Sequence, residues 1–237
     1  MSGRPQLLLD IEGTTTPVTF VTDVLFPFAR QRLRSFLDTH ASEPQVAAEL
    51  EALRQEHARE STEKPPPWDA KNPIASACAY LEWLMDRDRK TTPLKTLQGT
   101  IWEDGYRSGA LRSVVYADVR PAFERWRAAS RAIAIFSSGS VLAQKLLFAH
   151  TNAGDLTPFL SAYFDTTTGP KKEAASYARI ATAMQRRTQE LLFVSDVAAE
   201  LDAAQAAGLA TALCVRPGAA APTSRAHRKI ESFAELD

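Results

Sequence analysis

The sequence predicts an α/β fold: a Rossmann-like core with a parallel sheet, into which a helical domain is inserted after the first strand. Two observations predict it. In the second half of the 237-residue chain, short apolar runs alternate with helical patterns, which is typical of parallel crossover units. A long helical stretch separates the first apolar run, residues 7–9, from the others. We therefore assign residues 1–16 and 116–237 to the core and residues 17–115 to a helical cap.

The first predicted strand is a run of leucines that ends in acidic residues. Continuous apolar residues over Leu7–Leu9 indicate a strand buried on both faces. Asp10 and Glu12 follow, and Gly13 with the threonines at 14–16 predicts a turn. Ligands bind at the carboxyl ends of strands in parallel sheets. The two acids are thus placed for metal and phosphate chemistry, although a strand end with two solvated acids is the plain alternative.

The cap segment begins with two predicted helices. Apolar residues recur at helical spacing over residues 28–37, and Pro27 suits a first turn or a kink. Ser42 and Gln45 have the spacing of a capping box, which predicts a second helix with its apolar stripe over residues 46–53.

Two further helices are predicted after a proline-rich loop. The prolines at 65–67 exclude a helix interior. Asn-Pro at 72–73 and Thr-Pro at 92–93 mark helix starts, because proline is favoured at the first helical position. The last of these helices is expected to end near Gly105 or Gly109.

The remainder of the chain alternates between the two kinds of element. Strands are predicted over residues 131–136, 162–165, 191–195 and 211–215. Helices are predicted over residues 118–129, 141–149, 173–184 and 198–207. The Ala/Pro-rich residues 219–223 predict a loosely ordered tail.

Composition limits the classes of partner. The 28 Lys and Arg residues equal the 28 Asp and Glu residues, which gives no reason to expect nucleic acid or an anionic membrane as a partner. No apolar run approaches the roughly 20 residues of a membrane span, and no leader sequence is recognised at the start. We expect a cytoplasmic monomer, with Cys78 and Cys214 as small buried apolar residues and the four histidines as structural or solvated groups.

Polar residues follow four of the predicted strands. In chain order they are Asp10 and Glu12, Ser137 and Ser138, Lys171 with Lys172, and Asp196. Each alone suits a helix cap or a solvated turn. Because the carboxyl ends of parallel strands lie at one edge of the sheet, we expect them to converge. Carboxylates, hydroxyls and a lysine together suit phosphoryl transfer, which needs a cation, hydrogen-bond donors and an in-line nucleophile.

The carboxylates have distinct predicted roles. Asp10 and Asp196 are placed to hold Mg²⁺, a hard ion that favours carboxylates and keeps several waters. Asp10 is the predicted nucleophile and would form an aspartyl-phosphate. Glu12 is placed to protonate the leaving oxygen and later to deprotonate a water.

The remaining polar groups are predicted to hold the phosphate. Ser137 or Ser138 would hydrogen-bond a phosphoryl oxygen, together with amides at the start of the following helix. Lys171 would bridge the phosphate and Asp10 as a point charge.

These motifs resemble those of the haloacid-dehalogenase superfamily of phosphatases, with a HAD-like core. The similarity is greatest to the enolase-phosphatases (acireductone synthases) of methionine salvage. It runs from about residue 7 to about residue 218, and four stretches carry it: residues 10–16 (DIEGTTT), 97–102 (LQGTIW), 137–148 (SSGSVLAQKLLF), and 163–166 (YFDT) with 169–171 (GPK).

The resemblance implies a reaction on 2,3-diketo-5-methylthiopentyl-1-phosphate, which is enolised and then dephosphorylated to the acireductone. It implies one Mg²⁺ per subunit, a small phosphorylated diketone as the substrate, and a metal site at Asp10, Glu12 and Asp196. In the superfamily, the position of Glu12 reaches the metal through its backbone carbonyl, which leaves the side chain for proton transfer. Phosphate and substrate binding fall to Ser137, Ser138 and Lys171.

Glu12 stands where most of the superfamily has aspartate, and the enolase-phosphatases share the glutamate. A second acid for the metal shell is less defined: Glu200 lies one helical turn after Asp196, and Asp202 is the weaker candidate. The base for the enolisation is Glu12 or a cap residue. Trp102, Leu97 and Tyr106 either line the substrate site or pack the cap's own interior.

Other functions stay open at this point. The same core could serve another phosphomonoesterase, acting on a sugar phosphate or phosphoglycolate, or a metal-independent dehalogenase. A catalytically silent protein that binds a phosphometabolite is the alternative of another class.

Overall fold

The computed structural model describes residues 4–219 and 226–236 and divides into two compact units. The core unit runs to Val21 and resumes at Arg112, and the helical unit comprises Thr22–Leu111. That the helical unit acts as a cap, over the predicted residues 17–115, stays a prediction. Most of the predicted tail, residues 220–223, lies outside the described residues.

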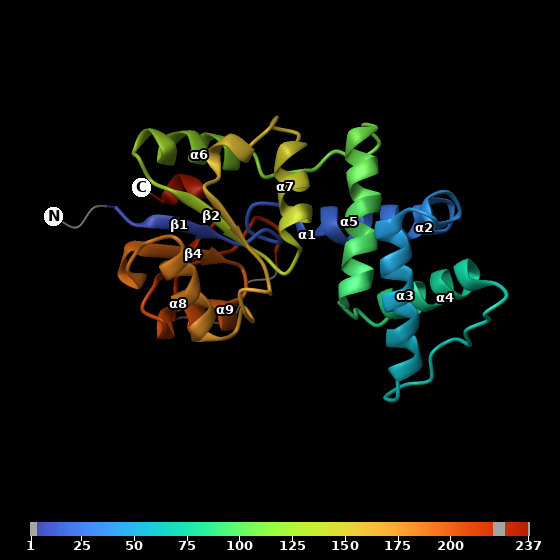
Figure 1. The fold of residues 1–237 in the computed structure, drawn as a ribbon. Coiled ribbons are helices and arrows are strands. Elements are labelled where there is room, and N and C mark those ends of the chain that lie inside the picture. Colours follow the sequence, from blue (N-terminus) through green and yellow to red (C-terminus); the bar gives the residue numbers. More distant parts are fainter. Residues whose placement is uncertain (1–3, 220–225, 237) are drawn as a thin grey trace. The chain divides into compact units, whose positions relative to one another are not determined.

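The described part of the core unit contains a sheet of six parallel strands (Figure 1). The strands are β1 (Gln6–Leu9), β2 (Ile133–Phe136), β3 (Ala162–Phe164), β4 (Leu191–Ser195), β5 (Ala210–Cys214) and β6 (Arg228–Ile230). Their order is β3-β2-β1-β4-β5-β6. The predicted parallel α/β core is confirmed, and β6 is an addition: two of its three residues are exposed and basic, so they form no apolar run.

Helices cover both faces of this sheet. Figure 1 shows α6 and α7 on one face and α8 and α9 on the other. The core unit contains α1 (Val18–Phe20), α6 (Val119–Ala128), α7 (Val141–Ala149), α8 (Ala174–Ala183) and α9 (Ala198–Ala206). The short 3₁₀ helices are η2 (Thr157–Phe159), η3 (Thr188–Glu190) and η4 (Phe233–Glu235). Between the sheet, α8 and α9, fully buried side chains such as Leu8, Phe136, Tyr177, Phe193 and Leu201 form the core.

The register of β1 places Asp10 level with the ends of its neighbours. Leu9 lies opposite Ile135 of β2 and opposite Val194 of β4. The chain runs outward from β1 to β3 on one side and continues with β4 on the other, so the strand order reverses at β1. Such a reversal opens a ligand-binding crevice at the carboxyl ends of the strands. The residues that follow β1, β2 and β4 meet there.

The helical unit consists of four longer helices preceded by a π-helical turn, η1 (Val21–Leu25). The helices are α2 (Phe26–His40), α3 (Pro44–Arg59), α4 (Pro73–Met85) and α5 (Thr92–Arg107). Both α2 and α3 pack against α4 and α5. Buried residues from all four form its interior, among them Leu33, Leu53, Leu81 and Leu97. Among residues 4–219 and 226–236, no helix combines the length and apolar character needed to cross a bilayer.

The helix starts of this unit differ from prediction in their caps. The capping box expected at Ser42 is wrong, because α3 begins at Pro44 after Glu43, whose side chain makes no capping hydrogen bond. Asn72 precedes α4 as predicted, but its amide donates to Asp69 Oδ2 at 2.6 Å instead of capping the helix. Proline at the first turn, with its fixed φ, is the start signal that the structure retains.

Candidate functional site

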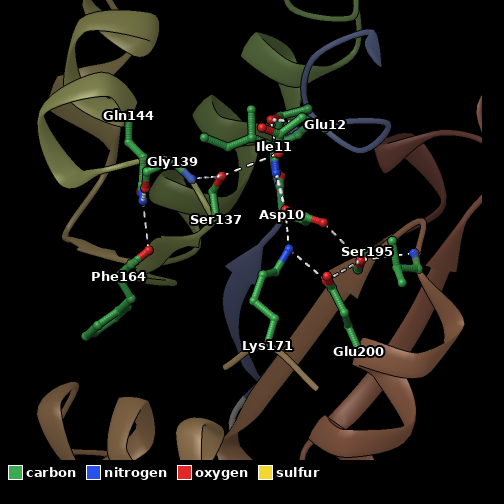
Figure 2. A network of polar contacts seen from close by, with 12 residues as sticks. Asp10, Ile11, Glu12, Ser137, Gly139, Gln144, Phe164, Lys171, Ser195 and Glu200 are labelled. Carbon is green, nitrogen blue, oxygen red and sulfur yellow. Dashed lines mark hydrogen bonds and ion pairs between the residues drawn. The ribbon is translucent and has the colours of Figure 1, made fainter. Parts of the chain in front are cut away.

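The carboxylate of Asp10 lies at the centre of a polar network at the carboxyl end of β1 (Figure 2). Asp10 is 2% exposed. Oδ1 accepts the Ile11 amide at 2.8 Å and lies 2.7 Å from Lys171 Nζ, whereas Oδ2 lies 3.1 Å from Ser195 Oγ. A carboxylate offers about four acceptor positions. Asp10 is therefore held in one orientation, and its Oδ2, contacted among the described residues only by Ser195, keeps acceptor capacity for further partners such as a cation and a phosphorus atom.

Lys171 joins Asp10 to a second buried acid, Glu200. Its ammonium lies 2.7 Å from Asp10 Oδ1 and 2.7 Å from Glu200 Oε2. Burial lowers the pKa of Lys171, but the two carboxylates more than offset this effect, so its pKa stands above the ordinary value. Burial and the charge of Asp10 raise the pKa of Glu200 to about 7. The predicted contact between Lys171 and Asp10 is present, and Glu200 is the acid that completes it.

Ser195, at the end of β4, bridges the same two acids. Its Oγ lies 3.1 Å from Asp10 Oδ2 and 3.1 Å from Glu200 Oε2, and accepts the Val197 amide. A hydroxyl carries one proton, so Ser195 donates to one acid at a time. Ser195 was not predicted as a site residue, because a serine at the end of a strand carries no signal of its partners.

The loop that carries Lys171 is fixed by the start of α8. Tyr177 Oη donates to the Lys171 carbonyl at 2.6 Å, and Ser176 Oγ donates to the Pro170 carbonyl at 2.8 Å. Gly169 has φ +144°, and a Cβ there would lie 2.3 Å from Ser176 Oγ. Only glycine fits this approach. The backbone thus sets the position of the ammonium.

The turn after β2 presents Ser137 toward Glu12. Ser137 Oγ lies 3.4 Å from Glu12 Oε2 and accepts the Gly139 amide at 3.2 Å. Ser140, by contrast, caps α7 with its hydroxyl. Ser138 is partly exposed and makes no hydrogen bond to the other predicted site residues in the described chain. The structure thus brings Ser137 into the network and leaves Ser138 beside it.

Gln144 holds this turn, although the sequence analysis assigned it no role. Its Nε2 donates to the Gly139 carbonyl at 2.9 Å and to the Phe164 carbonyl at 2.8 Å (Figure 2). The Phe164 carbonyl also accepts the Ser137 amide at 3.2 Å. The available signal was a polar residue in the buried stripe of α7, where Gln144 is 1% exposed.

We expect Gln144→Leu to lower kcat/KM for an aryl phosphate by about 10-fold to 100-fold, because the Gly139 carbonyl loses its side-chain donor and the Phe164 carbonyl keeps only the Ser137 amide, at about 1–3 kcal/mol for an unpaired group. Steady-state kinetics and urea unfolding measure the two effects. Leu142→Ala, at an exposed position of the same helix, is the control and should change neither. Unchanged kinetics in Gln144→Leu would show that the turn keeps its geometry without this side chain.

The turn after β1 is built around Gly13. The amides of residues 14–16 converge on the Ile11 carbonyl, and the Gly13 amide donates to the carbonyl of residue 16. Gly13 has φ +68°, and a Cβ there would lie 2.1 Å from Asp196 Oδ2. Glycine is therefore required twice, for the backbone conformation and for the close approach of the Asp196 carboxylate.

Three acids face one another across this turn. Burial, followed by the charge of Asp10, raises the pKa of Asp196 to about 6. The same two causes raise the pKa of Glu12. Like-charged carboxylates that raise one another's pKa form a site where a cation is favoured.

The residues present fit Mg²⁺. In the described residues, no three His, Cys, Asp or Glu side chains are arranged as a metal-binding cluster. A magnesium site does not require three, because the ion binds through one or two carboxylates and keeps several waters. Asp10 and Asp196 supply two carboxylates, while the Glu12 side chain turns toward Ser137. This agrees with a role for the Glu12 backbone carbonyl.

Arg216, which follows β5, stabilises the turn after β1. Its guanidinium donates twice to the Thr14 carbonyl, at 2.9 and 2.6 Å, and once to Asp118 at 2.7 Å. Its Cζ also lies over the rings of Tyr116, at 4.3 Å, and Phe233, at 4.6 Å. Asp118 also accepts the Phe233 amide at 2.7 Å. Contacts over such sequence distances left no local signal in the sequence.

The other candidates lie elsewhere. Asp202 Oδ1 is 2.9 Å from His227 Nε2, whose Nδ1 lies 2.9 Å from Thr211 Oγ1, so Asp202 does not join the cluster. Cys78 and Cys214 are buried and free, as predicted. Of the two acids considered for the metal shell, only Glu200 contacts the network.

Comparisons with known proteins agree with this geometry. Residues 7–208 match the family described as haloacid dehalogenase-like hydrolase. A crystal structure of the Unknown transcript 4 protein from Saccharomyces cerevisiae is similar, with a TM-score of 0.78 and 32% identity over 99% of this chain and 100% of that one. A dehalogenase structure, at 16% identity and a TM-score of 0.56 over 100% and 96% of the chains, shares the fold.

Curated relatives identify a smaller family within this one. A protein of Synechococcus elongatus named Enolase-phosphatase E1 is 56% identical over 97% of this chain and 96% of its own length. Proteins of the same name from Sorangium cellulosum and Pseudomonas syringae are 51% and 47% identical, over 97% and 98% of this chain and 96% of their own lengths. The chain therefore belongs to the haloacid dehalogenase-like hydrolases and, within them, to the enolase-phosphatase family.

Proposed function

We propose that the chain is a Mg²⁺-dependent enolase-phosphatase of methionine salvage, which converts 2,3-diketo-5-methylthiopentyl-1-phosphate to the acireductone 1,2-dihydroxy-3-keto-5-methylthiopentene and phosphate. The observation that carries the phosphatase assignment is the buried Asp10 carboxylate, fixed by Lys171 and Ser195 at the sheet edge. The curated relatives named Enolase-phosphatase E1 support the finer assignment.

In the phosphoryl step, the Asp10 carboxylate attacks phosphorus. A bond forms between Asp10 and phosphorus, and the bond from phosphorus to the substrate oxygen breaks. The Glu12 carboxyl gives its proton to the departing oxygen. Glu12 then takes a proton from a water that attacks the aspartyl-phosphate, which releases phosphate and restores Asp10. Mg²⁺, one per subunit and held by Asp10, Asp196 and the Glu12 backbone, would neutralise the phosphoryl charge.

The environment of Glu12 supports its role as the proton carrier. Burial and the charge of Asp10 raise its pKa, so it holds a proton at a higher pH than an exposed glutamate. Its Oε2 lies 3.4 Å from Ser137 Oγ, which points the carboxyl toward the turn assigned to phosphate binding. Ser137, Ser138 and Lys171 would donate hydrogen bonds to the phosphoryl oxygens.

The enolisation removes a proton next to a carbonyl, and the charge that develops on the carbonyl oxygen needs the same cationic surroundings. The proton passes to a base, with Glu12 or a residue of the helical unit as the alternatives, and the oxygen is protonated to give the enol. In the helical unit, Trp102 is 7% exposed and donates to the Leu25 carbonyl at 2.9 Å, which supports a structural role for this candidate.

Substrate profiling tests the finer assignment. With the phosphorylated diketone, absorbance of an enol should rise before phosphate is released. Phosphate release without an enol, or activity only on sugar phosphates or phosphoglycolate, would make the chain another phosphomonoesterase. If no phosphate ester is hydrolysed, the alternative of a non-catalytic binding protein is favoured.

Chelation with EDTA should abolish phosphate release from an aryl phosphate, and added Mg²⁺ should restore it. In the absence of substrate, Mg²⁺ should stabilise the fold by about 2.7 kcal/mol at a hundredfold excess over its Kd. Differential scanning calorimetry measures this. Asp196→Asn should lose the stabilisation, and Asp202→Asn, in the following helix α9 and paired with His227, should keep it. Activity that survives chelation would contradict the assignment. The cytoplasmic location and the monomeric state stay predictions.

A further inference from the structure

The helical unit contains a pocket of about 240 Å³, separate from the network around Asp10. Residues of η1, α2 and α5 line it, together with the last residue of α4 and the segment that follows. All lining residues belong to the helical unit. The volume is below the roughly 300–1,000 Å³ of pockets for drug-sized molecules, so a ligand would be small.

One side of the pocket is apolar. Phe26, Met85 and Leu94 contribute to its lining. Phe26 is 38% exposed, one of the few large apolar side chains at the surface of the described chain. An aromatic ring left open beside a cavity favours contact with an apolar group.

A buried amide faces the same space. Gln98 of α5 lines the pocket and is 7% exposed. Within residues 4–219 and 226–236, its side chain makes no hydrogen bond. The Gln98 amide atoms are not among the buried side-chain atoms that lack a partner in the described chain, so they are open to solvent inside the pocket. A ligand with a hydrogen-bonding group would replace solvent as the partner of this amide.

The pocket also carries an excess positive charge. Three of its cations have acidic partners: Arg30 pairs with Asp86, Arg89 with Glu60, and Lys90 with Asp88. Lys95 lines the pocket as well, one helical turn before Gln98. It has no ion pair among the residues that the structure describes. One unmatched ammonium beside an unmatched amide selects a ligand with a single negative charge.

We infer that this pocket binds a small monocarboxylate with a short apolar chain. The carboxylate would accept hydrogen bonds from Lys95 and from the amide nitrogen of Gln98, and the chain would lie against Phe26, Met85 and Leu94. The inference does not depend on the proposed reaction, because none of these residues is assigned to it.

Hexanoate titrated into the ¹⁵N-labelled full chain tests the inference by NMR. The side-chain amide signals of Gln98, identified by their disappearance in Gln98→Leu, should shift with a Kd on the order of 1 mM, as expected for about eight non-hydrogen atoms. Acetate, which lacks the chain, and hexanol, which lacks the charge, should each bind at least tenfold more weakly. Inorganic phosphate that binds as well as hexanoate would overturn the inference in favour of a general anion site.

Matched variants separate the pocket from non-specific binding. Lys95→Met should weaken hexanoate at least tenfold, and Lys64→Met, an exposed lysine of the same unit outside the pocket, should leave the affinity unchanged. Lys95→Arg, which keeps the charge, should retain binding and serves if the methionine variant is unstable. Equal affinity in Lys95→Met and the unmodified chain would overturn the inference.

Discussion

Asp10→Asn is expected to lower phosphate release by about 10⁴-fold or more, the scale seen when a nucleophile is removed from an enzyme. The amide keeps the size of the side chain but cannot form the aspartyl-phosphate. Its nitrogen would also face the Lys171 ammonium or the Ser195 hydroxyl, both of which now meet a carboxylate. A single-turnover assay with an aryl phosphate measures the loss.

The phosphorylated diketone separates the two steps of the reaction in this variant. If Asp10 acts only in phosphoryl transfer, the enol chromophore should still form and should persist, because its dephosphorylation is blocked. Asp38→Asn, an exposed position in the helical unit, is the control and should behave as the unmodified chain. Phosphate release at the normal rate in Asp10→Asn would show that another group is the nucleophile.

Lys171→Met is expected to abolish phosphate release and to destabilise the fold by about 3–5 kcal/mol, the cost of breaking a buried ion pair. The ammonium lies 2.7 Å from both Asp10 and Glu200, and the Lys171 side chain is 10% exposed. Without it, two acids remain close together with no cation in contact. Urea unfolding in the presence of EDTA measures the stability without compensation by metal.

A double-mutant cycle assigns this loss to the proposed contact. Glu200→Gln in the Lys171→Met background removes one of the two unpaired charges and the repulsion between them, so the double variant should be more stable than Lys171→Met alone. Lys172→Met, at the exposed neighbouring position, should change stability by less than about 0.5 kcal/mol. Strict additivity of the two substitutions would contradict the contact between Lys171 and Glu200.

The strands next to the site could be predicted because a strand that is buried on both faces has a continuous run of apolar residues. Leu7–Leu9, Ile133–Phe136 and Leu191–Ser195 are runs of apolar residues that end where polar groups begin. The edge strand Arg228–Ile230 has no such apolar run. Ser42 misled because capping-box spacing occurs by chance, and α3 starts after Glu43.

The convergence of the site was predictable, whereas its supporting contacts were not. Parallel strands bring their carboxyl ends together whatever their register, and this rule alone placed Asp10 near Lys171. The contact of Ser195 with Asp10 depends on register, since Leu9 lies opposite Val194. Gln144 acts through backbone carbonyls, which any residue can offer, so its place among the buried residues of α7 marks it as unusual without showing which groups it contacts.

Arg216 connects the C-terminal segment of the described chain to the turn beside Asp10. One guanidinium holds the Thr14 carbonyl, in the turn beside the nucleophile, and stacks on Phe233, while Asp118 ties the two together. The ordering of the turn and the ordering of residues 228–236 are therefore thermodynamically linked. Whatever tightens the turn also slows amide hydrogen exchange in that segment, and any local opening of the segment weakens the turn by the same free energy.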